Sequence, residues 1–150
     1  MMYLPNMSVD YSSRPAPWHP RVALIIALLF SWAGGGLIVY QNFARMGRAH
    51  LGRELLINSL LATLALILLA LLFTPTEGTQ LLILLLDLVG SVILYRLQLK
   101  PFQQWAKDHP QVMPSSGWTS LGWGLLGAVI AMGLAFFTSL VVASIGFRPS

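Results

Sequence analysis

Residues 81–99 read LLILLLDLVGSVILYRLQL, an apolar stretch with a single acid, Asp87, near its middle. An α-helix rises about 1.5 Å per residue and the hydrocarbon core of a bilayer is about 30 Å thick, so about 20 apolar residues cross it. The stretch therefore predicts a transmembrane helix. Because an ionised side chain is costly in hydrocarbon and usually has a function or a partner, Asp87 is the first candidate residue.

The composition places the whole chain in the same class. Of its 150 residues, 56% are hydrophobic and only 9% are charged, with a mean hydropathy of +0.72. A soluble domain has about 25% charged residues. The formal net charge of +4 comes mostly from residues that flank apolar runs, so a nucleic-acid partner is not expected. With no cysteine, disulfides, thiolate metal sites and cysteine nucleophiles are excluded.

The apolar runs predict an all-α, polytopic membrane protein built as a four-transmembrane-helix bundle. The predicted spans are residues 22–40, 55–73, 81–99 and 123–145 within one membrane domain, residues 21–150. Residues 1–20 predict a polar tail with four prolines, and residues 100–117 an interfacial loop too polar to insert. A signal peptide is the alternative interpretation of the first run, with Ser31 and Ala33 at its cleavage site.

The distribution of basic residues predicts the orientation. The connections after the first and third spans are basic, whereas the turn between the second and third carries only Glu77. Since cytoplasmic loops are enriched in Lys and Arg, both basic loops are expected in the cytoplasm and both chain termini on the opposite side. The basic residues either bind anionic lipid headgroups or dock an acidic partner. They are Arg45, Arg48, Arg53, Lys100 and Lys107.

Small residues recur at helical spacing on the first and fourth spans. In lipid, close backbone approach rather than hydrophobicity drives helix association, so such faces are typical of helix contacts. We expect the two spans to pack against each other or against a partner's helices. The positions are Ala23, Ala27, Gly34, Gly35 and Gly36 on the first span, and Gly124, Gly127, Ala128, Ala131, Ala135 and Ala143 on the fourth.

Asp87 shares a helix face with Ser91 and Gln98, at i+4 and i+11, and this face is expected to contact protein. Matching depths predicts one polar layer at Asp87 and a second at Ser91. The first adds Ser31, Trp32, Thr138 and Ser139, and the second adds Asn58, Ser59, Thr63 and Tyr95. Two interpretations stay open. Asp87 either joins helices, through neighbouring hydroxyl groups or a basic residue of a partner, or it binds or relays a proton or cation.

No catalytic motif is present. The sequence lacks HExxH, a phosphate-binding loop, GxSxG and a closely spaced acid pair. On the predicted topology His19 lies across the bilayer from His50 and His109, so no shared metal site is expected. We therefore expect no catalytic residue, no cofactor and no metal, and a protein that is not an enzyme.

The run from Trp18 to Arg53 opens with WHPR, continues as an apolar span ending in glycines, and closes with NFARMGR. It resembles a segment of small uncharacterised bacterial multi-span membrane proteins. The resemblance implies a bacterial inner-membrane location and brings no activity with it.

The function expected from the sequence is that of a non-enzymatic accessory or scaffolding subunit. Such a subunit packs against partner transmembrane helices, and its partners are membrane lipids and other membrane subunits or a second copy of itself. Two alternatives remain. One is an oligomeric channel or proton/cation transporter component that uses Asp87. The other is a lipid-binding or lipid-modifying membrane protein.

Overall fold

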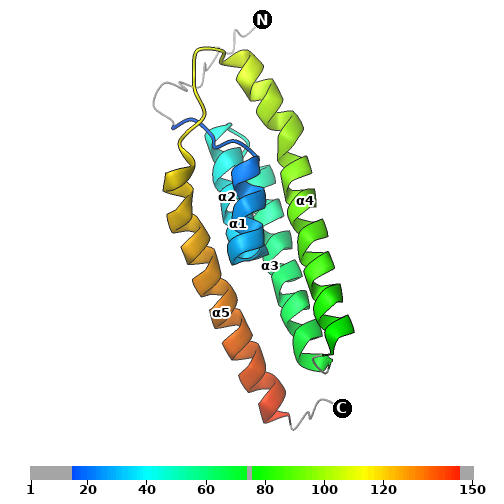
Figure 1. Ribbon diagram of the computed structural model, residues 1–150. Helices are drawn as coiled ribbons and strands as arrows, with labels where there is room; N and C mark the ends of the chain where they lie inside the picture. The colour runs from blue at the N-terminus through cyan, green and yellow to red at the C-terminus, as the bar shows by residue number, and fades with distance from the viewer. Residues whose placement is uncertain (1–14, 74–75, 146–150) are drawn as a thin grey trace, which may run out of the picture.

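The computed structural model describes residues 15–73 and 76–145, and it is all α (Figure 1). The helices are α1 (Arg21–Phe30), α2 (Trp32–Arg45), α3 (Ala49–Leu72), α4 (Glu77–Asp108) and α5 (Ser120–Ser144), with one 3-10 turn, η2 (Gly117–Thr119). Three segments of the described chain are long and apolar enough to cross a membrane: α3, α4, and η2 together with α5. The all-α class predicted from the sequence is confirmed.

The first predicted span, residues 22–40, is not one helix. Ser31 has φ of 154° and separates α1 from α2. The two helices fold back on each other as a hairpin. Its two ends lie together, since the Trp18 N–H just before α1 donates to Asn42 Oδ1 near the end of α2, at 2.8 Å. With 10 and 14 residues they are about 15 and 21 Å long, too short to cross a core of about 30 Å. A helical hairpin therefore replaces the single span, and the described residues hold three helices of spanning length, not four.

Glycines make this hairpin possible. A Cβ atom on Gly35 would lie 2.6 Å from the Cβ of Ala27 and 3.3 Å from the carbonyl oxygen of Ala23, so α1 and α2 are in near backbone contact. The Ser31 hydroxyl accepts a hydrogen bond from the Gly34 N–H at 3.3 Å and caps α2. Hydropathy measures only how apolar a run is, and therefore does not distinguish a hairpin from a span.

The three consecutive glycines of α2 serve three different neighbours. Successive helix positions differ by about 100°, so adjacent residues face different sides. A Cβ on Gly34 would contact the Gly124 carbonyl of α5 at 3.3 Å, and one on Gly36 would overlap Ser59 of α3. Gly35 faces α1 and also Leu94 of α4, 3.1 Å from its ideal Cβ. Helix α2 thus lies at the centre of the bundle.

Helix α4 is longer than the predicted third span. It continues through Pro101 to Asp108, so half of the predicted interfacial loop, residues 100–117, is helical. Proline lacks an N–H donor and normally ends a helix. Here Phe102 and Trp105 lie on the inner face of the following turns and are buried, and their packing stabilises the continuation.

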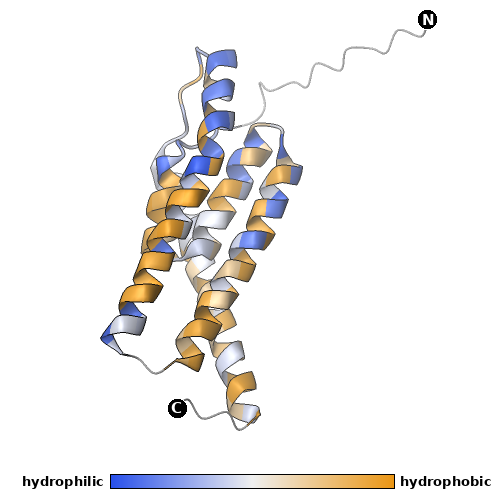
Figure 2. Cartoon of the chain, turned by 90° about the vertical axis from the view of Figure 1, so that its right-hand side faces the viewer, coloured by the Kyte–Doolittle hydropathy of each residue, from blue (hydrophilic) through white to orange (hydrophobic). Residues whose placement is uncertain are grey.

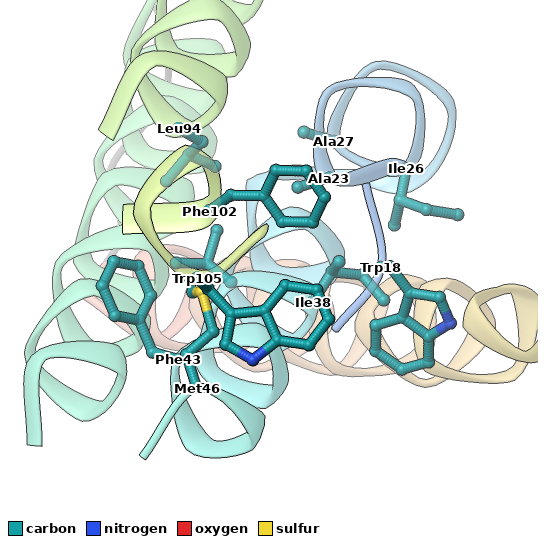
Figure 3. Close-up of a cluster of buried hydrophobic side chains, with 11 residues drawn as sticks. Trp18, Ala23, Ile26, Ala27, Ile38, Phe43, Met46, Leu94, Phe102 and Trp105 are labelled. Atoms are coloured by element: carbon teal, nitrogen blue, oxygen red, sulfur yellow. The ribbon is translucent and has the colours of Figure 1, made fainter. Parts of the chain in front are cut away.

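Trp18, in the segment before α1, belongs to the same buried cluster as Phe102 and Trp105 near the end of α4 (Figure 3). Its indole N–H contacts the Ser116 carbonyl and the Thr119 hydroxyl at 3.0 and 2.9 Å, and the Arg45 guanidinium lies 3.6 Å from its ring centre. The predicted polar tail therefore ends before Pro17, because Pro17, Trp18 and Pro20 are all buried. Residues 1–14 of that tail lie outside the described residues.

The N-terminal described residues lie beside the basic loops, not at the opposite end as the sequence prediction had it. Figure 2 shows hydrophilic residues gathered where the turn after α2 and the end of α4 meet. His19 is also there, with its ring 5.3 Å from that of Phe102, whereas it was expected across the bilayer from His109. Burial first, and the nearby Arg21 second, lower the pKa of His19 below its ordinary 6.5, which favours a neutral ring. Because the hairpin returns the chain to the end of the bundle where it starts, three helices of membrane-spanning length remain in the described residues.

Candidate functional site

A cleft lies beneath the tip of the hairpin. The hairpin turns at Ser31, while α3, α4 and α5 continue past it (Figure 1). The space left between these three helices is a cleft of about 520 Å³. It is lined by Leu29, Phe30, Ser31 and Trp32 of the tip, by Thr63, Leu66, Ile67 and Ala70 of α3, by Ile83 and Asp87 of α4, and by Ala128, Ala131, Met132 and Ala135 of α5.

Among the described residues that line the cleft, Asp87 is the only ionisable one, and it is half-buried. Its backbone carbonyl accepts a hydrogen bond from the Trp32 indole N–H at 3.0 Å. A Cβ on Gly90 would overlap the Trp32 ring, so Gly90 makes room for this contact. Within the described residues, the carboxyl group itself has neither a hydrogen-bond nor an ion-pair partner. Asp87 thus lacks a counter-charge from the described part of its own chain.

Ser91 is fully buried, and its hydroxyl oxygen has no hydrogen-bond partner. A serine inside a helix usually donates to the carbonyl four residues earlier, which here belongs to Asp87. That carbonyl already accepts from Trp32. The indole therefore occupies the acceptor that Ser91 would otherwise use.

The structure places only part of the first predicted polar layer in the cleft. Ser31 and Trp32 line it beside Asp87. Thr138 is buried but does not line the cleft, and Ser139 is exposed and donates to the Ala135 carbonyl at 2.7 Å. Thr138 and Ser139 do not line the cleft because α5 faces it with alanines and carries its hydroxyl residues further along the helix.

The second predicted layer is also divided. Thr63 lines the Asp87 cleft and donates to the Ser59 carbonyl at 2.8 Å. Ser59 is buried against Gly36 and donates to the Leu56 carbonyl at 2.9 Å. Asn58 is exposed and lines a separate cavity of about 310 Å³ between α3 and α4. These hydroxyl groups are satisfied by their own helix and do not reach Asp87.

The small residues fall into two groups. The first group makes close helix contacts inside the chain: Ala23, Ala27, Gly34, Gly35, Gly36, Gly124 and Gly127. The second group, Ala128, Ala131 and Ala135, faces the cleft. Ala143 is exposed. The stripe on α5 thus packs against the hairpin over its first half and lines the cleft further along, and α5 also contacts α3.

Of the predicted basic residues, Arg45 serves the fold. It donates to the Ala16 carbonyl at 2.9 Å as well as covering the Trp18 ring. Arg48 contacts Gln104 at 3.1 Å beside a polar cavity of about 560 Å³. Three others are exposed at this end of the molecule: Arg53, Lys100 and Lys107.

A buried amide pair was not predicted as a site. The Asn42 side chain donates to the Trp18 carbonyl at 3.1 Å and to Gln98 Oε1 at 2.8 Å, and Gln98 donates in turn to the Leu94 carbonyl at 3.2 Å. Both amides are at most 1% exposed. The spacing from Asp87 had placed Gln98 on the helix face that is expected to contact protein. Asn42 was missed because it follows the apolar run and reads as part of a loop.

Among the described residues, no three His, Asp or Glu side chains come together in a group that could hold a metal ion. No family model, no curated protein and no solved structure matches the sequence.

Proposed function

We propose that this chain is a non-catalytic integral membrane subunit that receives a transmembrane helix of a partner in the cleft beneath its hairpin. The observation that carries the proposal is the wall of the cleft on α5. Ala128, Ala131 and Ala135 present small side chains along a cleft that none of the described helices fills. In lipid, such faces associate because they allow two backbones to come close.

The surface of the three long helices supports the same role. Only 11% of the apolar window of each is buried within the chain. Most of this surface is therefore available to lipid and to other transmembrane helices. Small residues follow every four positions along α5, from Gly127 in the contact with the hairpin to Ala131 and Ala135 in the open cleft. This continuation indicates where a further helix fits.

The charge distribution supports an orientation with the basic end in the cytoplasm. With the hairpin in place, Arg21 joins the basic residues of the two loops, while Glu77 stands at the other end of α4. In the four-span topology, Arg21 lay at the end opposite the basic loops. With the hairpin, the difference in the number of basic residues between the two ends of the bundle is therefore larger. A bacterial inner membrane is the location that we propose.

The test is native mass spectrometry of the gently solubilised protein, with Ala131→Leu compared with Ala143→Leu. Both changes add the same atoms to α5, but only Ala131 faces the cleft. We expect wild type and Ala143→Leu to carry an unlike membrane chain and Ala131→Leu to lose it. Retention of the partner by Ala131→Leu would contradict the proposal.

A second candidate, a proton or cation transporter component, is favoured by one observation. Two half-length helices end at Ser31 next to Asp87, and broken helices with an acid at mid-depth are typical of ion sites in transporters. A homo-oligomer without unlike chains, together with ion flux that Asp87→Asn abolishes in vesicles, would favour this candidate instead.

A further inference from the structure

We infer that the partner helix carries a lysine or arginine near the middle of its span, and that this cation pairs with Asp87. The inference rests on the proposed function and adds the chemistry of the partner. It starts from Asp87, whose carboxyl group has no counter-charge among the described residues.

The depth of Asp87 fixes where the partner's cation must lie. Helix α4 begins at Glu77, ten residues before Asp87. Ten residues correspond to about 15 Å along the helix, or half of a hydrocarbon core of about 30 Å. A basic residue at the end of a partner helix would reach the interface instead, so a mid-span position is required.

The described helices around Asp87 supply no cation at its depth. On α4 the next basic residue is Arg96, which is exposed and lies nine residues, or about 13 Å, further along the helix. Residues 54–72 of α3 and residues 120–144 of α5 contain neither Lys nor Arg. A second copy would therefore bring no cation to this depth either, which makes the partner an unlike chain.

A lipid chain fits the cleft less well than a cationic helix. An acyl tail would leave Asp87 unpaired in hydrocarbon, whereas an opposite charge compensates it. A free metal ion fits less well still. Hard cations take six or more oxygen ligands. The other polar side chains of the cleft are Trp32 and the hydroxyls of Ser31 and Thr63, which already contact the Gly127 and Ser59 carbonyls.

The test uses designed transmembrane peptides as probes. Each peptide has about 20 Leu and Ala residues, the length of one span, with a central Lys, Leu or Glu. The full chain is reconstituted with each peptide in phosphatidylcholine vesicles, and association is measured by energy transfer. We expect the Lys peptide to bind wild type at least tenfold more tightly than the Leu peptide, and the Glu peptide to bind least.

Variants assign this preference to Asp87. Asp87→Asn should bind the Lys and Leu peptides equally, and Asp87→Glu, which keeps the charge, should retain the preference. Ala131→Leu, which narrows the cleft, should weaken the binding of both peptides. A Lys preference that survives in Asp87→Asn would overturn the inference.

The outcomes separate this inference from the function on which it rests. If Lys and Leu peptides bind wild type equally and Ala131→Leu weakens both, the cleft receives a helix but Asp87 does not select it; the inference fails and the proposed function stands. If no peptide binds wild type, both fail.

Discussion

At the scale of single residues, Ser91 and Trp32 compete for one acceptor. The Asp87 carbonyl takes the indole N–H of Trp32 at 3.0 Å, and the Ser91 hydroxyl is left buried without a partner. A buried polar group without a hydrogen bond costs about 1–3 kcal/mol. The Ser91 hydroxyl thus stays without a hydrogen bond, while the hydrogen bond to the Asp87 carbonyl holds the Trp32 ring in place at the tip of the hairpin.

This competition predicts that removing the Ser91 hydroxyl stabilises the protein. Ser91→Ala should raise the free energy of unfolding by about 1 kcal/mol, because it deletes a desolvated group that makes no bond. In a Trp32→Phe background the Asp87 carbonyl is free to accept from Ser91, so the same change should give no gain. Reversible unfolding of the four forms in detergent measures the difference. Equal loss of stability in both backgrounds would show that the hydroxyl has a partner after all.

At the scale of elements, the contact between the hairpin and α5 depends on glycine. A Cβ on Gly127 would overlap the backbone of Gly34, whereas one on Gly133, in the same helix, meets nothing within 4 Å. The two glycines share a helix and differ in what lies opposite them. They therefore form a matched pair for testing the packing.

We expect Gly127→Ala to destabilise the protein and Gly133→Ala not to. Backbone atoms cannot move aside as a flexible side chain does, so the first change should lower the unfolding free energy by about 1–3 kcal/mol. The second should be neutral or raise it by up to about 1 kcal/mol, since alanine is the better helix former. Thermal unfolding in detergent compares them. Equal stability of the two variants would show that α5 does not pack on the hairpin at Gly127.

At the scale of the whole molecule, the hairpin changes how the chain crosses the bundle. The start of the described chain and the turn between α2 and α3 lie at one end, and the end of α3, the start of α4 and the end of α5 lie at the other (Figure 1). Three described helices are long enough to cross a membrane, and the two described ends of the chain lie at opposite ends of the bundle.

Cysteine labelling tests this topology directly, because the natural chain has no cysteine. Pro15→Cys, His50→Cys, Glu77→Cys and Ser144→Cys place single thiols at exposed positions. With an impermeant maleimide, we expect the first two to react from the cytoplasmic side only and the last two from the opposite side only. If Pro15→Cys and Glu77→Cys both reacted with the maleimide from the same side of the membrane, residues 22–40 would be a single span.

The sequence by itself determined the class of the protein and its apolar segments. Long apolar runs with few charges leave only helices, because backbone polar groups in lipid must be satisfied within the segment. The runs at residues 55–73, 81–99 and 123–145 therefore predicted helices, and α3, α4 and α5 cover them except for the last residue of the first and third runs. The spacing of Ser91 and Gln98 also showed which side of α4 faces protein, and both are fully buried.

Only the tertiary structure decided the hairpin, the side on which the chain begins, and the surroundings of Asp87. Each depends on contacts between residues distant in the sequence, such as Trp18 with Asn42, Gly34 with Gly127, and Trp32 with Asp87. An apolar run has the same hydropathy whether it crosses the core once or turns back at Ser31. The physical reason is that hydropathy measures transfer from water, whereas helix pairing in lipid is decided by steric fit and a few hydrogen bonds.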